Sequence, residues 1–147
     1  MKSESLHFRY IEWKTPDEMH FTSLQWKSKL DFINDENRFF EDMLKEYMMP
    51  IVKSPLFSKI QDLVGQLSQS KEVLKGLNET VNEHSRRLSR LIDNVDQPKE
   101  ARLYRQEHKR IMKELNQFLK KYERLKREVF ENVSLALKQQ KQKRLIA

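Results

Sequence analysis

The chain contains no cysteine and only two glycines among its 147 residues. The lack of cysteine excludes disulfide bonds, thiol catalysis and zinc or iron–sulfur sites held by thiolates. Two glycines are too few for a glycine-rich phosphate loop or a dinucleotide fingerprint, and neither a nucleophile elbow nor a His-Glu-x-x-His motif occurs. We therefore expect a protein that is not an enzyme and that carries no cofactor.

Long hydrophobic runs are also missing from the sequence. No stretch approaches the roughly 20 apolar residues of a membrane-spanning helix. The first residues, Met1 to Glu4, lack the apolar core of a secretion signal. We expect a soluble, cytoplasmic protein without a membrane span.

Three long segments carry apolar residues at alternating steps of three and four. This spacing averages 3.5 residues and places a narrow apolar seam along one side of a helix, as in coiled coils. If the chain reverses near residue 53 and again near residue 96, Trp26 falls opposite Val81, and Val81 falls opposite Ile111. Both reversals coincide with prolines. The sequence therefore predicts an all-α fold, an elongated antiparallel three-helix bundle that runs up, down and up with coiled-coil-like heptad packing.

Prolines and capping residues set the expected helix ends. The segment Thr15–Glu18 combines an N-cap, a proline at the first helical position and a glutamate two residues later. Ser54 repeats the cap before a second proline, Pro98 starts the third helix, and Pro50 closes the first. We expect an N-terminal aromatic arm at 1–15, a bundle at 16–142 with helices at about 16–49, 55–95 and 98–142, and a basic tail at 143–147.

Three heptad-bearing helices folded up, down and up over roughly residues 16–136, with Trp26 near the start of the first, resemble a spectrin-type repeat. The expected helices are longer than those of that family, and no defining motif of it is present. The resemblance therefore implies the architecture and no function.

Charge is distributed unevenly between the first and third expected helices. The chain carries a net charge of +7, but residues 16–49 hold four basic and eight acidic side chains, whereas residues 98–147 hold fifteen basic and six acidic ones. Such helices, as parallel neighbours, stabilise a bundle through flanking charge pairs. The alternative is sequence-independent binding of nucleic acid through the basic third helix. The phosphate contacts in that alternative are Lys109, Arg110, Lys120, Lys121, Arg124, Lys126 and Arg127.

Polar residues interrupt the three seams at two matching heights. A polar group buried singly costs on the order of 1 to 3 kcal/mol, whereas grouped polar side chains can satisfy one another. We expect both layers to fix the register of the helices, as a seam asparagine does in coiled coils. One layer consists of Asn37, Ser70 and Tyr122, and the other consists of Ser23, His84 and His108.

The histidine layer allows two further interpretations. Two imidazoles that face each other in a buried site cannot both be charged cheaply, so stability would depend on pH. His20 lies one turn before Ser23, which makes His20, His84 and His108 the alternative ligands of a metal ion. We expect no metal, because a seam histidine is more often a hydrogen-bonded core residue than a ligand.

Apolar residues outside the main seams form secondary stripes on the first and third helices. Together with the seams, these stripes make the apolar side of each helix wider than packing in a three-helix bundle requires. They therefore either widen the core, receive the N-terminal arm or form an interface. We expect a structural or protein–protein interaction module that binds a protein partner or forms a homodimer. The candidate interface residues are Trp26, Phe32, Phe39, Met43, Met112 and Leu119.

Overall fold

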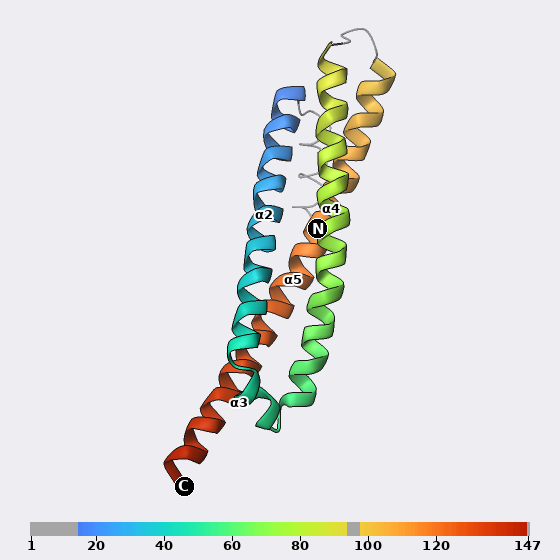
Figure 1. The fold of residues 1–147 in the computed structure, drawn as a ribbon. Helices are drawn as coiled ribbons and strands as arrows, with labels where there is room; N and C mark the ends of the chain where they lie inside the picture. The colour runs from blue at the N-terminus through green and yellow to red at the C-terminus, as the bar shows by residue number, and fades with distance from the viewer. Residues whose placement is uncertain (1–14, 94–97, 147) are drawn as a thin grey trace. The chain divides into compact units, whose positions relative to one another are not determined.

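The computed structural model describes residues 15–93 and 98–146, and all regular elements in these two stretches are helices (Figure 1). The predicted all-α fold is confirmed. The N-terminal arm predicted at 1–15 lies outside the described residues, apart from its last residue. Within the described stretches, none of the helices combines the length and the apolar character needed to cross a membrane. The helices are α2 (Pro16–Glu46), α3 (Met48–Lys53), α4 (Phe57–Asp93) and α5 (Pro98–Ile146).

The starts of α2 and α4 follow the capping chemistry of their sequences. The backbone N–H of Glu18 donates to Thr15 Oγ1 over 3.2 Å, which caps α2. Ser54 Oγ accepts the N–H of Leu56 over 3.0 Å in a turn that precedes α4. Because this turn occupies the residues after Ser54, α4 begins at Phe57 rather than at the predicted residue 55.

The first predicted helix, at 16–49, is divided in the structure. α2 ends at Glu46, and α3 begins after Tyr47. Pro50 explains the break, because it has no N–H to donate to the carbonyl of Glu46 and its ring would collide with that carbonyl in a continuous helix. Pro50 lies instead in the first turn of α3, where an N–H is not needed. The prediction that Pro50 closes the helix is corrected accordingly.

The last helix is longer than predicted. Residues 143–146 belong to α5, so the basic tail predicted at 143–147 is helical over its described part. Residues 138–146 are almost all helix formers, and no glycine or proline occurs there to stop the helix. The second predicted helix, at 55–95, is described as far as Asp93.

The described helices contribute to two compact units, and each unit contains a part of α2, of α4 and of α5. The first unit contains α2 as far as Asp31, α4 from Lys75 and α5 as far as Gln117. The second unit contains α2 from Phe32, all of α3, α4 as far as Leu74 and α5 from Phe118.

In each unit, most of the buried side chains along the long helices are three or four residues apart. These steps place the buried positions on one side of each helix. Burial of an apolar side chain of this size contributes about 1.5 to 3 kcal/mol, so the two cores supply most of the stabilising energy. The core of the first unit contains Met19, Leu30, Leu77, Val81, Leu88, Tyr104, Ile111, Met112 and Leu115. The core of the second unit contains Ile33, Phe40, Ile51, Ile60, Leu63, Leu67, Leu74, Phe118, Tyr122, Leu125, Val129, Val133 and Ala136.

Candidate functional site

Two histidines meet in the core of the first unit. His84 of α4 and His108 of α5 are both 0% exposed, and His84 Nε2 lies 2.9 Å from His108 Nδ1. Each histidine lies on the buried side of its helix, between buried residues such as Val81 and Leu88 on α4 and Tyr104 and Ile111 on α5. The structure therefore brings together two of the three residues predicted to share this layer.

A carboxylate sets the protonation of the histidine pair. His84 Nδ1 lies 3.1 Å from Glu107 Oε1, and Arg87 Nη2 lies 2.5 Å from the same oxygen. A carboxylate only accepts hydrogen bonds, so His84 Nδ1 carries a proton, and the neutral ring accepts at Nε2 the hydrogen bond that His108 Nδ1 donates. Burial lowers the pKa of His84, although the hydrogen bond to Glu107 acts in the opposite direction. The buried ring is therefore held in its neutral form.

Aromatic rings enclose the histidine pair from two sides. The ring of Tyr104 stacks on His84 with centroids 4.0 Å apart, and Trp26 of α2 stacks on His108 with centroids 4.4 Å apart. The Tyr104 hydroxyl donates to the backbone carbonyl of His84 over 3.0 Å, and burial raises the pKa of this hydroxyl. Trp26, predicted as an interface residue, is half-buried against the pair. The cluster thus joins all three helices of the first unit.

The third residue of the histidine layer does not bond to the histidines. Ser23 is 1% exposed, and its hydroxyl donates to the carbonyl of Met19 over 2.9 Å. A serine engaged with its own helix is not poised as a nucleophile next to a histidine base. The geometry of Glu107, His84 and His108 is that of a buried hydrogen-bonded network, which fixes how α4 and α5 meet.

The alternative metal site does not assemble. His20 is exposed on α2, whereas His84 and His108 are buried. Across the stretches that the structure describes, no group of three or more histidine, aspartate or glutamate side chains is arranged to hold a metal ion. Both ring nitrogens of His84 are already engaged in hydrogen bonds.

The side chains of the second predicted polar layer, Asn37, Ser70 and Tyr122, do not bond to one another as expected. The Tyr122 hydroxyl donates to Glu36 Oε1 over 2.9 Å, and Lys126 Nζ lies 2.7 Å from Glu36 Oε2. Asn37 is 3% exposed, and its amide has no hydrogen-bond partner among the described residues, while Ser70 is half-buried. The long tyrosine side chain reaches a charged carboxylate, which is a stronger acceptor than an amide. Mutual satisfaction of the three layer residues is therefore not found.

The bonds to Glu36 affect the titration of both partners. Burial raises the pKa of Tyr122, and the hydrogen bond to Glu36 adds to this effect. The hydrogen bond to the same carboxylate raises the pKa of Lys126. Glu36 thus ties α2 to α5 in the second unit through one neutral and one charged donor.

Exposed phenylalanines gather on the second unit. Phe32 and Phe39 of α2 are 62% and 57% exposed, and Phe130 of α5 is 38% exposed. The ring centroids of Phe39 and Phe130 lie 6.5 Å apart. The ring of Phe130 also meets the ring of the buried Phe40 edge to face, with centroids 5.0 Å apart. Phe32 and Phe39 are two turns apart on the same side of α2. We call Phe32, Phe39 and Phe130 the aromatic patch.

The other predicted interface residues differ in their exposure. Met43 and Leu119 are half-buried. Met112 is only 9% exposed and belongs to the core of the first unit, so its assignment to an interface is corrected. Ile111, Met112 and Leu115 are all buried, which shows that α5 turns a face broader than a single seam into this core.

The basic residues of α5 include both paired and exposed side chains. Lys126 pairs with Glu36, an ion pair that joins the acidic helix to the basic one, and Arg110 Nε lies 3.9 Å from Glu114 Oε1 in the next turn. A side chain held by a carboxylate is less available to a phosphate group. The exposed members of the predicted nucleic-acid contacts are Arg110, Lys120, Lys121, Arg124 and Arg127, and Lys109 is half-buried.

Sequence reasoning missed two charged residues that bond to the partners of the buried polar side chains or to these side chains themselves. Arg87 and Glu36 were not assigned to either layer, although each lies within one turn of a layer residue on its own helix. Arg87 follows His84 by three residues, and Glu36 precedes Asn37 directly. A search for charged residues within one turn of each seam interruption would have found both.

We compared the chain with known protein families, with curated proteins and with solved structures, and none of the three comparisons gave a significant match.

Proposed function

We propose that α2, α4 and α5 pack in each unit as an antiparallel three-helix bundle with coiled-coil-like heptad packing. Burial of the seam positions supports this proposal, since Leu30, Leu63 and Ile111 are each 0% exposed. The contacts among Trp26, His84 and His108 support it further, because they link α2, α4 and α5 within the first unit, although the predicted register places Trp26 opposite Val81 rather than opposite the histidines.

We propose that the protein is a non-enzymatic interaction module that associates with a second copy of itself through the aromatic patch. The observation that carries this proposal is the exposure of two neighbouring α2 phenylalanines, Phe32 at 62% and Phe39 at 57%, next to Phe130. Exposed aromatic side chains that gather on one face are typical of interaction surfaces, because each ring gains free energy when a partner removes it from water.

The charges around the aromatic patch favour a second copy as the partner. Asp35 and Asp42 flank Phe39 at one turn to either side on α2, and Arg127 lies one turn before Phe130 on α5. All three charged side chains are exposed. In a two-fold symmetric contact, α2 of one copy meets α5 of the other. Asp35 and Asp42 of one copy then lie near Arg127 of the other, at the edge of the contact between the phenylalanines.

Light scattering coupled to size exclusion tests the proposal directly. The unmodified chain is expected to show twice the mass of one chain, and the Phe32→Ser, Phe39→Ser variant is expected to show the mass of a monomer. The matched control is Phe21→Ser, Leu24→Ser, which removes two exposed apolar side chains from the part of α2 in the first unit (61% and 50% exposed). This control is expected to remain a dimer.

Two results would contradict self-association through this surface. One is a monomeric mass for the unmodified chain over the whole accessible concentration range. The other is an unchanged dimer in the Phe32→Ser, Phe39→Ser variant, which would place the contact elsewhere.

A further inference from the structure

One end of the second unit contains basic residues and no acidic ones. We call residues 47–61 and 132–146 the acid-free end, because these 30 positions include six basic side chains and not one aspartate or glutamate. The hydroxyl of Ser54 donates to Gln139 Oε1 over 3.4 Å, so the two segments lie against each other. The basic residues are Lys53, Lys59, Lys138, Lys141, Lys143 and Arg144, and all of them are exposed.

The six cations of the acid-free end differ from many basic residues elsewhere in the chain. Lys71, Arg87 and Lys126 each have a carboxylate partner. No ion pair within the described stretches involves any of the six cations. Within the described stretches, their positive charge is therefore not held in an ion pair and can act on a partner.

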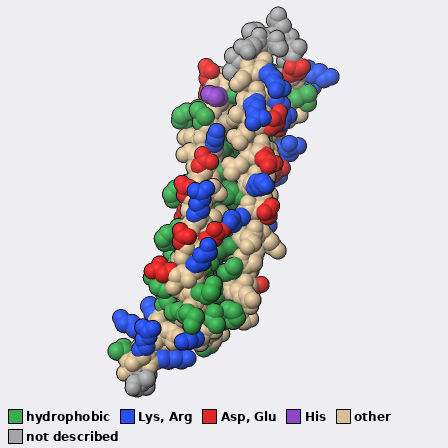
Figure 2. Space-filling view, in the orientation of Figure 1, with side chains coloured by type: hydrophobic (Ala, Val, Ile, Leu, Met, Phe, Trp, Pro, Cys, Tyr) green, Lys and Arg blue, Asp and Glu red, His purple; other side chains and the backbone are tan. Residues whose placement is uncertain are grey.

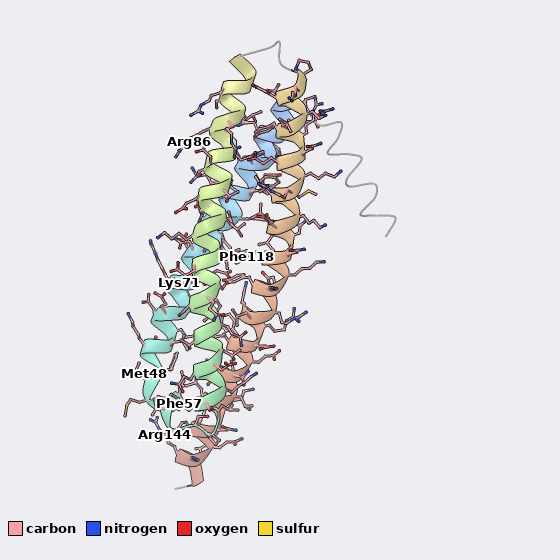
Figure 3. All side chains as sticks on the ribbon, turned by 90° about the vertical axis from the view of Figure 1, so that its right-hand side faces the viewer. Met48, Phe57, Lys71, Arg86, Phe118 and Arg144 are labelled. Carbon is pink, nitrogen blue, oxygen red and sulfur yellow. The ribbon has the colours of Figure 1, made fainter. Side chains whose placement is uncertain are left out.

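The same end exposes a group of apolar side chains. Ile51 is 5% exposed, and its burial turns the opposite side of α3 outward. Figure 2 shows hydrophobic side chains next to Lys and Arg side chains at this end of the second unit, and Figure 3 shows Met48, Phe57 and Arg144 close to the same end. The exposed apolar residues are Met48, Met49, Val52, Phe57, Leu135 and Leu145, with exposures of 54%, 65%, 49%, 38%, 47% and 77%.

We propose that the acid-free end docks on the surface of a lipid bilayer that contains anionic lipids. Such a surface offers negative headgroups to lysine and arginine and an apolar layer directly beneath them for methionine, phenylalanine and leucine. Long basic side chains extend their charge to the headgroups while their stems lie along apolar atoms. The combination, at one end of the unit, of exposed apolar side chains and cations without an ion pair in the described stretches matches both parts of the bilayer interface.

A nucleic acid fits this surface less well. Phosphate groups would satisfy the six cations and Phe57 offers one ring on which a base can stack, but the other five exposed apolar side chains are aliphatic or thioether groups and offer no such ring. Met48, Met49 and Val52 would then stay exposed to water. The bilayer accounts for both classes of side chain, whereas a soluble polyanion accounts for one.

Sedimentation of the full chain with lipid vesicles tests this proposal. We expect binding to vesicles of phosphatidylcholine with phosphatidylserine and little binding to vesicles of phosphatidylcholine alone. The Lys141→Gln, Lys143→Gln variant is expected to bind the anionic vesicles about 30-fold more weakly, since each cation near the surface contributes a similar share of the attraction. The matched control, Lys113→Gln, Lys120→Gln, makes the same change in net charge at two exposed lysines of α5 outside this end and is expected to bind as the unmodified chain does.

A second pair of variants tests the apolar contribution. Met48→Gln, Met49→Gln is expected to weaken binding about tenfold, because two half-exposed side chains lose their transfer into the apolar layer. Val73→Gln, Leu103→Gln removes two exposed apolar side chains elsewhere (52% and 51% exposed) and is expected to leave binding unchanged. Circular dichroism of each variant establishes that it is folded, and the lysine variants test the proposal even if the methionine variant does not fold.

Three outcomes would overturn the proposal. The first is equal binding to both vesicle types, and the second is an equal loss in the two lysine variants. The third is binding of a DNA duplex or of poly-L-glutamate that needs Lys141 and Lys143, combined with no sedimentation on anionic vesicles. The Phe32→Ser, Phe39→Ser variant is expected to bind vesicles, so this test is independent of self-association through the aromatic patch.

Discussion

His84 Nε2 lies 2.9 Å from His108 Nδ1 in a site where neither side chain is exposed. Burial lowers the pKa of His84 from its ordinary value of 6.5. At pH values around and below 6.5, His84 is therefore protonated to a greater extent in the unfolded chain than in the folded chain, until the folded His84 titrates as well. Protonation favours the unfolded state over this range.

The first prediction is that the free energy of unfolding falls as the pH is lowered from about 7.5 to about 5.5. The slope from one histidine is at most about 1.4 kcal/mol per pH unit. Urea unfolding at several pH values measures it. His84→Gln is expected to reduce the slope, whereas the control His20→Gln, which removes an exposed histidine of the same unit, is expected to retain it. An equal slope in the unmodified chain and in His84→Gln would contradict the assignment.

The second prediction concerns the two donors that meet at Glu36. Tyr122→Phe removes one hydrogen bond to a charged acceptor and is expected to cost about 1.5 to 3 kcal/mol of unfolding free energy. The same substitution in a Glu36→Gln background is expected to cost less, because the charged acceptor is already gone. A double-mutant cycle from urea unfolding gives the coupling.

A more exposed ion pair of the same unit provides the control for Glu36. Lys71 and Glu41 form a pair whose side chains are 42% and 45% exposed. Water screens such a pair, so Glu41→Gln is expected to change the unfolding free energy by less than about 1 kcal/mol. A coupling of zero between Tyr122 and Glu36 would show that their hydrogen bond does not stabilise the second unit.

The regular parts of this fold could be predicted from sequence because they depend on local chemistry. The seam spacing identifies positions such as Leu30 and Leu63 that the structure buries completely. The cap at Thr15 and the proline that follows it define the start of α2 within one residue. The exposed Phe32 and Phe39 could also be identified, since they lie outside the seam.

The remaining features depend on how far a side chain extends and on which of several possible partners it bonds to, and the spacing of residues in the sequence does not determine either. Pro50 can either end a helix or sit in the first turn of the next, and both choices satisfy the same local rule. From the sequence, the Tyr122 hydroxyl could donate to Asn37 of its own layer or to the neighbouring Glu36. The length and direction of the tyrosine side chain bring it to Glu36. Met112 is buried because α5 turns a broad face inward, whereas a seam of one residue in three or four would leave it outside.

The third prediction concerns the two glycines of α4. Gly65 and Gly76 are exposed and lie in the interior of the helix, and a Cβ added at either would meet nothing within 4 Å. Neither glycine has a positive φ, so alanine fits the backbone without strain. Gly65→Ala and Gly76→Ala are each expected to raise the unfolding free energy by about 0.5 to 1 kcal/mol.

The two glycine effects are expected to add, because the positions are separated by about 16 Å along the helix. Thermal and urea unfolding of the single and double variants measures this. A loss of stability in either single variant would contradict this prediction.

The fourth prediction concerns Asn37, which is 3% exposed and whose amide has no hydrogen-bond partner among the described residues. Burial of such a group costs about 1 to 3 kcal/mol, so Asn37→Leu is expected to raise the unfolding free energy by a similar amount. The matched control is Asn34→Leu, at an exposed position of the same helix, which makes the same change in helix propensity without altering a buried group. If Asn37→Leu instead destabilises the chain while Asn34→Leu does not, the amide is satisfied by a buried water, and the layer stabilises the fold. If Asn37→Leu stabilises the chain but gives a mixture of oligomeric states in light scattering, the amide specifies the register of the helices. A seam asparagine in a coiled coil does the same and lowers stability.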